Sequence, residues 1–277
     1  MKKKQVMDLS SALSSLGEIK QCAERKRLAV FLDYDGTLTP IVERPEEAVL
    51  SQESRQAVQN LAELCTVAVL SGRDLQEVQH LVGIENIFFA GSHGFDIVGP
   101  SHRQIQNQQG MGFLPALDEA EQELRDGLDV IAGALVERKR FSVAVHFRLV
   151  GENDVDHVEK VVDRVLAGQD RLRKGYGKKV FEVLPNIDWH KGKALLWLLE
   201  ALGLDGDEVL PMYLGDDVTD EDAFEVLANR GIGIFVKGSG GPAKTSADYA
   251  LEDCAEVRLF LIELAGFLRA VQKSGNC

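Results

Sequence analysis

Two carboxylates stand two residues apart directly after an apolar run. Asp33 and Asp35 follow the run 28–32, and Gly36 and Thr37 come next. A continuous apolar run predicts a parallel strand buried on both faces, and open α/β sheets bind ligands at the carboxyl ends of such strands. One carboxylate could attack phosphorus, the other could transfer a proton, and both could help to hold Mg2+. The alternative is a strand followed by an ordinary polar turn, because Asp and Gly are common turn residues.

Two further polar residues stand at the ends of predicted elements. Ser71 follows the predicted strand 66–70, where its hydroxyl and backbone N–H could donate to a phosphate oxygen at a helix N-terminus. A helix N-cap is the structural alternative for this serine. Lys191 begins a predicted helix, and a cation is unfavourable at that end of the helix dipole, so we expect an anionic group nearby. An ordinary solvated lysine is the alternative, and Lys193 is a competing candidate.

An acidic cluster follows the predicted strand 210–214. Five acids occur within the seven residues 216–222, which is more than helix capping requires. Asp216, directly at the strand end, is the natural Mg2+ ligand beside Asp33, since this cation prefers carboxylate and water oxygens. An EF-hand is a poor alternative because the run lacks its ligand spacing and central glycine, and a strand precedes it.

The predicted helices and strands that must position these residues alternate along the chain, and one segment of different periodicity interrupts this alternation. Short apolar runs alternate with helical patterns over 27–110 and 186–277, which predicts an α/β fold with a parallel-sheet core. Residues 111–185 differ, and we predict that they form a small inserted α+β domain. Residues 1–26 form an N-terminal extension to which the sequence assigns no role. The predicted core strands are 28–32, 66–70, 87–90, 210–214 and 232–236, and the predicted core helices are 52–64, 71–83, 191–203, 219–228 and 256–271.

Within the insertion, helical and alternating patterns succeed one another. An apolar stripe predicts an amphipathic helix over 113–135, and alternation over 141–149 predicts a half-buried antiparallel strand. A helix at 154–168 and strands at 171–173 and 179–184 follow. Arg148 falls on the predicted polar face of the strand 141–149. Lys139 has the parity of the apolar face, so it must precede the strand or follow a bulge.

Composition narrows the class of protein. The 277 residues, 45% of them hydrophobic, can form one large domain or two smaller ones. The net charge of −13 disfavours binding to nucleic acid or to an anionic membrane surface. Every apolar segment is too short to span a bilayer, and the lysines at 2–4 lack the apolar run of a signal peptide. Four scattered cysteines are typical of a reduced cytosolic protein, so we expect a cytoplasmic location, and no feature predicts a protein partner.

In order and context, these polar groups resemble the four motifs of the haloacid dehalogenase superfamily of phosphohydrolases. Longer runs are similar to the trehalose-6-phosphate phosphatase family, and the resemblance extends over about residues 28–268. The similar runs are 33–41, 90–94, 145–148, 188–195 and 215–224. The resemblance implies a cap domain inserted into a Rossmann-like core. It also implies Mg2+-dependent hydrolysis of trehalose 6-phosphate through an aspartyl-phosphate, with the cap closing over the sugar.

The resemblance further implies roles for single residues. Asp33 would be the nucleophile, and Asp35 would protonate the leaving sugar oxygen and then activate water. Ser71 and Lys191 would hold the phosphoryl oxygens. The implied Mg2+ ligands are Asp33, Asp35 through its carbonyl, Asp216, and Asp220 as an outer ligand or as an orienter of Lys191. The implied substrate-binding residues are Gly36, Thr37, Gly72, Arg73, His93 and Gly94 in the core and Glu137, Lys139, Arg148 and Glu182 in the cap.

Alternatives remain at two levels. Lys139 and Glu182 could be solvated or ion-paired surface residues. The substrate could be another sugar phosphate, such as a glucosylglycerol or mannosylglycerate precursor, in which case the cap decides between them. A non-catalytic domain that senses a sugar phosphate is the third function, but it would not need the nucleophile Asp33 together with Asp35, Lys191 and Asp216.

Overall fold

The computed structural model describes residues 3–42, 44–102, 110–177, 179–238 and 241–275. The chain divides into two compact units. Unit 1 comprises Met1–Ile105 and Trp189–Cys277, and unit 2 comprises Gln106–Asp188.

Unit 1 is built on an eight-stranded sheet in the order β2-β14-β12-β11-β3-β4-β5-β6. All neighbouring strands are parallel except β5 and β6. The strands are β2 (Ser10–Ser11), β3 (Arg27–Leu32), β4 (Thr66–Leu70), β5 (Phe88–Gly91), β6 (Asp96–Val98), β11 (Val209–Gly215), β12 (Ile232–Val236) and β14 (Tyr249–Leu251). The predicted α/β class with a parallel core sheet is confirmed. Because β3 and β11 are parallel neighbours, the segments that follow them lie side by side.

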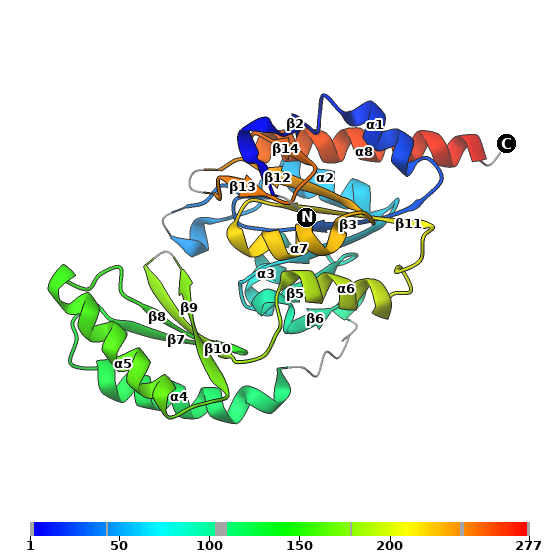
Figure 1. The fold of residues 1–277 in the computed structure, drawn as a ribbon. Helices are drawn as coiled ribbons and strands as arrows, with labels where there is room; N and C mark the ends of the chain where they lie inside the picture. Colours follow the sequence, from blue (N-terminus) through cyan, green and yellow to red (C-terminus); the bar gives the residue numbers. More distant parts are fainter. Residues whose placement is uncertain (1–2, 43, 103–109, 178, 239–240, 276–277) are drawn as a thin grey trace. The chain divides into compact units, whose positions relative to one another are not determined.

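Helices cover both faces of this sheet, as Figure 1 shows for α2 and α8 on one face and α6 and α7 on the other. One core cluster joins α1, α2, α3 and α8 to the strands through residues such as Val58, Val78 and Phe260. On the other face, the ring of Phe224 on α7 contacts the rings of Tyr213 and Phe235. The helices are α1 (Leu16–Ala23), α2 (Gln52–Ala62), α3 (Leu75–Val82), α6 (Lys191–Ala201), α7 (Glu221–Leu227) and α8 (Cys254–Gly275).

Two helices show how local sequence sets their ends. The Ser51 side chain accepts a hydrogen bond from the Ser54 N–H and caps α2, where the sequence predicts an N-cap. Helix α3 begins at Leu75, with Asp74 as its N-cap, so the prediction that it opens at Ser71 was wrong. It ends at Gly83, whose φ of 61° places it in the left-handed region that favours glycine.

The N-terminal segment belongs to unit 1. Strand β2 pairs with β14 at the edge of the main sheet, and β1 (Lys4–Gln5) pairs antiparallel with β13 (Lys244–Thr245). Ile19 and Ala23 of α1 are buried in the core cluster. None of these elements was predicted from the sequence. The strands β1, β2 and β13 have two residues each, which is too short to produce a readable alternation, and the eight-residue helix α1 was also missed.

Unit 2 is a four-stranded antiparallel sheet in the order β7-β8-β10-β9 with two helices. Val143, Val145 and Phe181 pack with apolar residues of both helices. The elements are α4 (Leu114–Leu128), β7 (Leu135–Lys139), β8 (Ser142–His146), α5 (Val155–Ala167), β9 (Leu172–Gly177) and β10 (Val180–Pro185).

Three expectations for this unit were wrong. Helix α4 ends at Leu128 instead of continuing to 135, and the chain turns at Gly133, which has a φ of 87°, before Leu135 starts β7. The apolar spacing happens to continue through that turn, so periodicity alone could not detect it. The expected polar face of β8 is in part buried, since Ala144 is 1% exposed. Arg148 lies in a turn beyond the end of β8, so it is not on a strand face.

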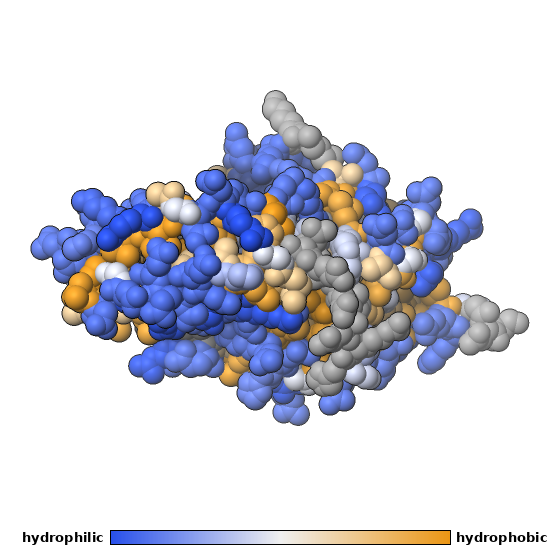
Figure 2. Space-filling model, turned by 90° about the horizontal axis from the view of Figure 1, so that it is seen from below, coloured by the Kyte–Doolittle hydropathy of each residue, from blue (hydrophilic) through white to orange (hydrophobic). Residues whose placement is uncertain are grey.

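On the face of the molecule drawn in Figure 2, hydrophilic side chains predominate and groups of hydrophobic ones lie between them. Within the described ranges, no helix combines the length and the apolarity needed to cross a membrane. Cys22, Cys65 and Cys254 are free thiols, and Cys277 lies outside the described residues.

Candidate active site

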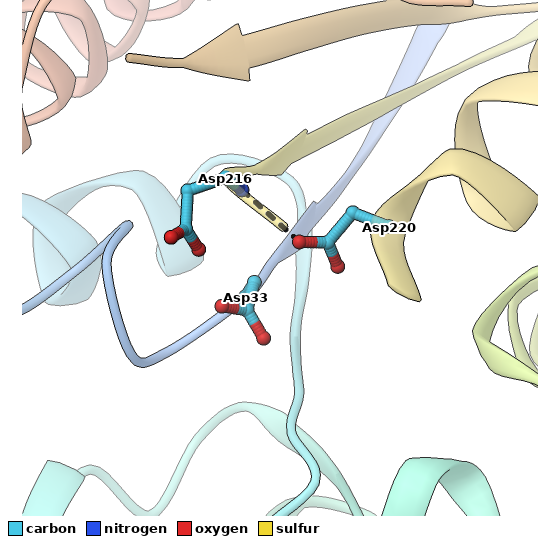
Figure 3. Close-up of side chains that lie close together, drawn as sticks. All are labelled: Asp33, Asp216 and Asp220. Atoms are coloured by element: carbon cyan, nitrogen blue, oxygen red, sulfur yellow. Dashed lines mark hydrogen bonds between the residues drawn. The ribbon is translucent and has the colours of Figure 1, made fainter. Parts of the chain in front are cut away.

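Three carboxyl groups meet at the carboxyl edge of the sheet in unit 1 (Figure 3). Asp33 follows β3, Asp216 follows the neighbouring β11, and Asp220 ends the short 3-10 helix η7 (Val218–Asp220). One oxygen of each lies within 4.8 Å of the others, and all three residues are buried. The parallel pairing of β3 with β11 therefore brings together acids that are 183 residues apart, which is the arrangement expected from the sequence.

Lys191 is the cation of this cluster. It is the first residue of α6 and is 4% exposed. Its Nζ donates to Asp33 Oδ1 at 2.6 Å and to Asp220 Oδ1 at 2.7 Å. The anionic partner expected from its place at a helix N-terminus is therefore present, and the alternative of a solvated lysine is wrong for Lys191.

Asp220 is held by four donors. Oδ1 accepts from Lys191 and, at 2.5 Å, from the hydroxyl of Tyr213 on β11. Oδ2 accepts from the backbone N–H groups of Asp216 and Asp217, each at 3.0 Å. Tyr213 was not predicted from the sequence, because a strand buried on both faces is apolar throughout and gives no sign of which side chain has a polar role. With both oxygens occupied, Asp220 is placed to orient Lys191.

Burial and mutual repulsion control protonation in the cluster. Burial raises the pKa of Asp33 well above its usual range, and the carboxylates of Asp220 and Asp216 add to this, while Lys191 opposes it. Burial, with Asp220 again adding to it, raises the pKa of Asp216 to about 7. Burial opposes the charge on Lys191, but the carboxylates of Asp220 and Asp33 raise its pKa above the usual value. Three acids thus share one lysine, and a second cation would relieve their repulsion.

The residues fit a small divalent cation. Asp216 Oδ1 is buried and has no hydrogen-bond partner among the described residues, which is costly unless a ligand occupies it. A Cβ on Gly36, which has a φ of 86°, would lie 2.0 Å from Asp216 Oδ2, so only glycine lets this loop approach the carboxylate. Hard oxygen donors in such a cluster are the ligands that Mg2+ prefers.

Ser71 has a different local role from the one expected. It is buried, and its backbone N–H donates to the Ala90 carbonyl at 2.9 Å, so this N–H does not point to a ligand. Its Oγ accepts from the Arg73 N–H at 3.1 Å, which closes the turn between β4 and α3. The hydroxyl proton is still available for a phosphate oxygen.

Arg73 contacts two acids. Its guanidinium donates to both oxygens of Asp35, at 2.7 Å each, and it also contacts Glu77 on the first turn of α3. The guanidinium carbon lies 5.6 Å from the centre of the Tyr34 ring. Asp35 is therefore held by Arg73, and its carboxylate does not belong to the group of Asp33, Asp216 and Asp220.

The remaining predicted residues of the core form the loops around these side chains. Thr37 is fully buried, and its Oγ1 has no hydrogen-bond partner among the described residues. Gly72 lies against the ring of His93, because a Cβ there would be 2.7 Å from His93 Cε1. Gly94 has a φ of 92°, and its Cβ would lie 2.2 Å from Ala194 Cβ on α6. These glycines permit contacts that a larger residue would block.

In unit 2, three of the four predicted residues share one sheet face. Glu137 on β7 and Glu182 on β10 both pair with Ala144, and Lys139 pairs with Ser142. This face is opposite to the one that packs on α4 and α5. His146 Nε2 lies 2.7 Å from Glu137 Oε2. The fourth residue, Arg148, is exposed in the turn after β8. Lys139 had the parity of the apolar face of the strand predicted at 141–149, but it lies on β7, which precedes β8, so this parity does not apply to it.

Comparisons with known proteins show the family of this chain. The family model described as trehalose-phosphatase matches residues 31–255. Trehalose 6-phosphate phosphatase RA3 of Zea mays is 43% identical over 268 residues, covering 92% of this chain and 74% of the relative. Trehalose-phosphate phosphatase B of Arabidopsis thaliana is 40% identical, covering 95% and 73%. The crystal structure of a trehalose-6-phosphate phosphatase related protein superimposes with a TM-score of 0.74 at 25% identity, covering 87% of this chain and 99% of the other.

Proposed function

Because the chain belongs to the trehalose-phosphatase family, we propose that it hydrolyses trehalose 6-phosphate to trehalose and inorganic phosphate through an aspartyl-phosphate. The observation that carries the proposal is the buried contact of Lys191 with Asp33 and Asp220, beside the Asp216 oxygen for which the described part of the chain provides no hydrogen-bond partner. A carboxylate at a strand end, neutralised on one side by a lysine, is suited to attack an incoming phosphate.

In the first step, an oxygen of Asp33 attacks phosphorus, and the bond between phosphorus and the sugar oxygen breaks. Asp35 gives its proton to that oxygen, so that trehalose leaves as an alcohol. Lys191 and the Ser71 hydroxyl would donate to the phosphoryl oxygens, which carry the negative charge. Asp220 would keep Lys191 in place throughout.

In the second step, water attacks phosphorus and gives a proton to Asp35. The bond between phosphorus and Asp33 breaks, so that phosphate leaves and both aspartates return to their starting forms. One carboxylate thus serves first as an acid and then as a base. Thr37 and Gly36, on the loop that follows, would border the phosphate.

Asp33 and Asp216, with the Asp35 carbonyl, would hold Mg2+. When bound, the ion would offset the charge of the phosphate and of the clustered carboxylates. Asp220 would act on the ion only indirectly, because both of its oxygens already accept hydrogen bonds.

We assign sugar recognition to unit 2. Glu137, Lys139 and Glu182 provide two acceptors and one donor on a single sheet face, a combination that suits the hydroxyl groups of a neutral sugar. Arg148 is the weakest member of the predicted set, because it lies in a turn away from the shared strand rows.

The test is phosphate release from a panel of sugar phosphates, with Mg2+ and with EDTA. We expect trehalose 6-phosphate to give the highest kcat/KM, and EDTA to abolish the activity. If the protein hydrolysed a glucosylglycerol or mannosylglycerate precursor faster, that sugar phosphate would replace trehalose 6-phosphate as the proposed substrate. Tight binding of trehalose 6-phosphate without phosphate release would instead indicate a sensing domain.

A further inference from the structure

Arg73 is occupied on every side that the structure describes. It is 9% exposed, pairs with both oxygens of Asp35 and contacts Glu77. Its guanidinium also lies near the Tyr34 ring. The two bonds to Asp35 form the parallel fork that gives an arginine–carboxylate pair a defined geometry. An arginine held in this way has little freedom to contact a substrate.

The backbone around Arg73 is equally fixed. Its N–H donates to Ser71 Oγ, and its carbonyl accepts from the Ser92 N–H at 2.7 Å. Glu77 lies one turn along from Arg73, in the first turn of α3, and contacts the guanidinium from the helix side. The turn after β4 and the start of α3 together aim the guanidinium at Asp35.

We propose that Arg73 is a positioning residue that acts through Asp35 and does not bind the substrate, in contrast to the role implied by the family resemblance. This inference rests on the proposed function of Asp35 as proton donor and acceptor. Arg73 restricts the carboxylate to one orientation and favours its ionised form, which is the form that accepts a proton from water in the second step. For the first step, a proton on one Asp35 oxygen takes the place of one bond of the fork, and the other bond keeps the carboxyl group oriented. Glu77 supports Arg73 from the other side.

Substrates with different leaving groups distinguish this positioning role from substrate binding. A sugar alkoxide needs a proton to leave, whereas p-nitrophenolate leaves without one. Replacing Arg73 with Met should therefore lower kcat/KM on trehalose 6-phosphate about 10- to 100-fold, less than the roughly 10²- to 10⁴-fold of general acid–base catalysis, because Asp35 itself is still present. On p-nitrophenyl phosphate, kcat/KM should change little, while kcat and KM fall together because water attack on the phosphoryl-enzyme becomes slow. Equal losses of kcat/KM on both substrates would overturn the proposal.

A double-mutant cycle provides a second readout. In the D35N background, the further change R73M should cost little, since its partner is already disabled. A full additional loss in that background would mean that Arg73 acts independently of Asp35. R73K keeps the charge but loses the fork, so it should give a smaller loss with the same dependence on the leaving group. It also keeps the test decisive if R73M folds poorly.

Arg55 offers a matched control. This partly buried arginine donates to the carbonyls of Val82 and Leu81 at the other end of α3 and touches no acid of the site. R55M should lower thermal stability, but any change in kcat/KM should be the same for trehalose 6-phosphate and p-nitrophenyl phosphate. If R55M lowered kcat/KM selectively on trehalose 6-phosphate, as expected for R73M, the proposal would be contradicted. If the wild-type protein does not hydrolyse trehalose 6-phosphate, the proposed substrate fails. The positioning role of Arg73 is then still tested on p-nitrophenyl phosphate, where R73M should lower kcat but leave kcat/KM nearly unchanged.

Discussion

At the scale of single residues, the chemistry of the site follows from an imbalance of charge. Asp33, Asp216 and Asp220 are buried around one lysine. An unpaired carboxylate is costly to bury, so such an arrangement persists only if it is used. Lys191 and Tyr213 compensate Asp220, whereas one oxygen of Asp216 has no hydrogen-bond partner among the residues that the structure describes. From this difference we propose that Asp220 supports Lys191 and that Asp216 binds a ligand.

Replacing Asp33 with Asn should remove turnover almost completely, because the amide cannot attack phosphorus while its size is unchanged. The measurement is phosphate release under saturating substrate, with the melting temperature as a check on folding. D217N is the matched control, since Asp217 is an exposed neighbour in the acidic cluster, and it should retain nearly wild-type rates. Turnover by D33N close to that of the wild type would contradict the assigned nucleophile.

Asp216 should leave a signature in the pH dependence of stability without metal. Its pKa of about 7 in the folded chain is above the unfolded value of about 3.9, so the folded state binds more protons between these values. In EDTA, the free energy of unfolding should therefore fall as pH rises from about 4 to 7, by at most about 1.4 kcal/mol per pH unit for this group. D216N should show a shallower fall in urea titrations at several pH values. Identical slopes in both proteins would contradict the raised pKa.

Asp216 should also control the metal requirement. D216A should lose most activity at low Mg2+ and recover part of it in excess Mg2+, because the remaining oxygen ligands still form a weakened site. Activity is measured against Mg2+ concentration. A loss of activity that is independent of the Mg2+ concentration would contradict the assignment of Asp216 as a metal ligand.

At the scale of elements, parallel strand ends and glycine-containing loops build the site. The sequence predicted the strand ends well, since the apolar runs before Asp33 and Asp216 are continuous and each is followed at once by an acid. It could not predict contacts between loops. The close approach of Gly36 to Asp216 and the hydrogen bond from the Ser92 N–H to the Arg73 carbonyl depend on tertiary structure. The same holds for Ser71, whose backbone N–H is used within the sheet.

Gly94 is expected to be essential for the position of α6. G94A would place a methyl group against Ala194 and would force alanine into a left-handed conformation. We expect a loss of about 1–2 kcal/mol from the backbone and a further 1–3 kcal/mol from overpacking. G203A is the control, because Gly203 has a φ of 61° but nothing within 4 Å of its Cβ. Urea midpoints should show a clearly larger loss of stability for G94A than for G203A. Equal losses would show that the contact with Ala194 contributes nothing to the effect.

At the scale of the whole molecule, we propose that unit 1 performs the phosphoryl chemistry and that unit 2 selects the sugar. Unit 1 holds the acids, Lys191 and the loops around them, and unit 2 holds Glu137, Lys139 and Glu182. The change of periodicity within the sequence predicted a distinct α+β region. It could not predict where α4 stops or that Arg148 leaves its strand, because both depend on turns whose residues continue the apolar or polar pattern.

Replacing Glu182 with Ala should therefore affect the two substrate types unequally. Loss of a buried hydrogen bond to a sugar hydroxyl is worth about 1–3 kcal/mol, or roughly 5- to 150-fold in kcat/KM on trehalose 6-phosphate. Hydrolysis of p-nitrophenyl phosphate should change little. E123A, on the exposed side of α4, is the control and should leave both rates unchanged. Equal losses on both substrates would show that Glu182 supports folding or chemistry and not sugar recognition.

The central claim is that Asp33 carries the phosphoryl group during turnover of trehalose 6-phosphate. It is tested most directly by quenching the reaction during steady-state turnover with Mg2+, reducing the acyl phosphate with borohydride and locating the modified residue by mass spectrometry. We expect reduction at Asp33 alone, and none in EDTA or in D33N. Modification of another carboxylate, or rapid phosphate release with no modified residue at any time point, would contradict it.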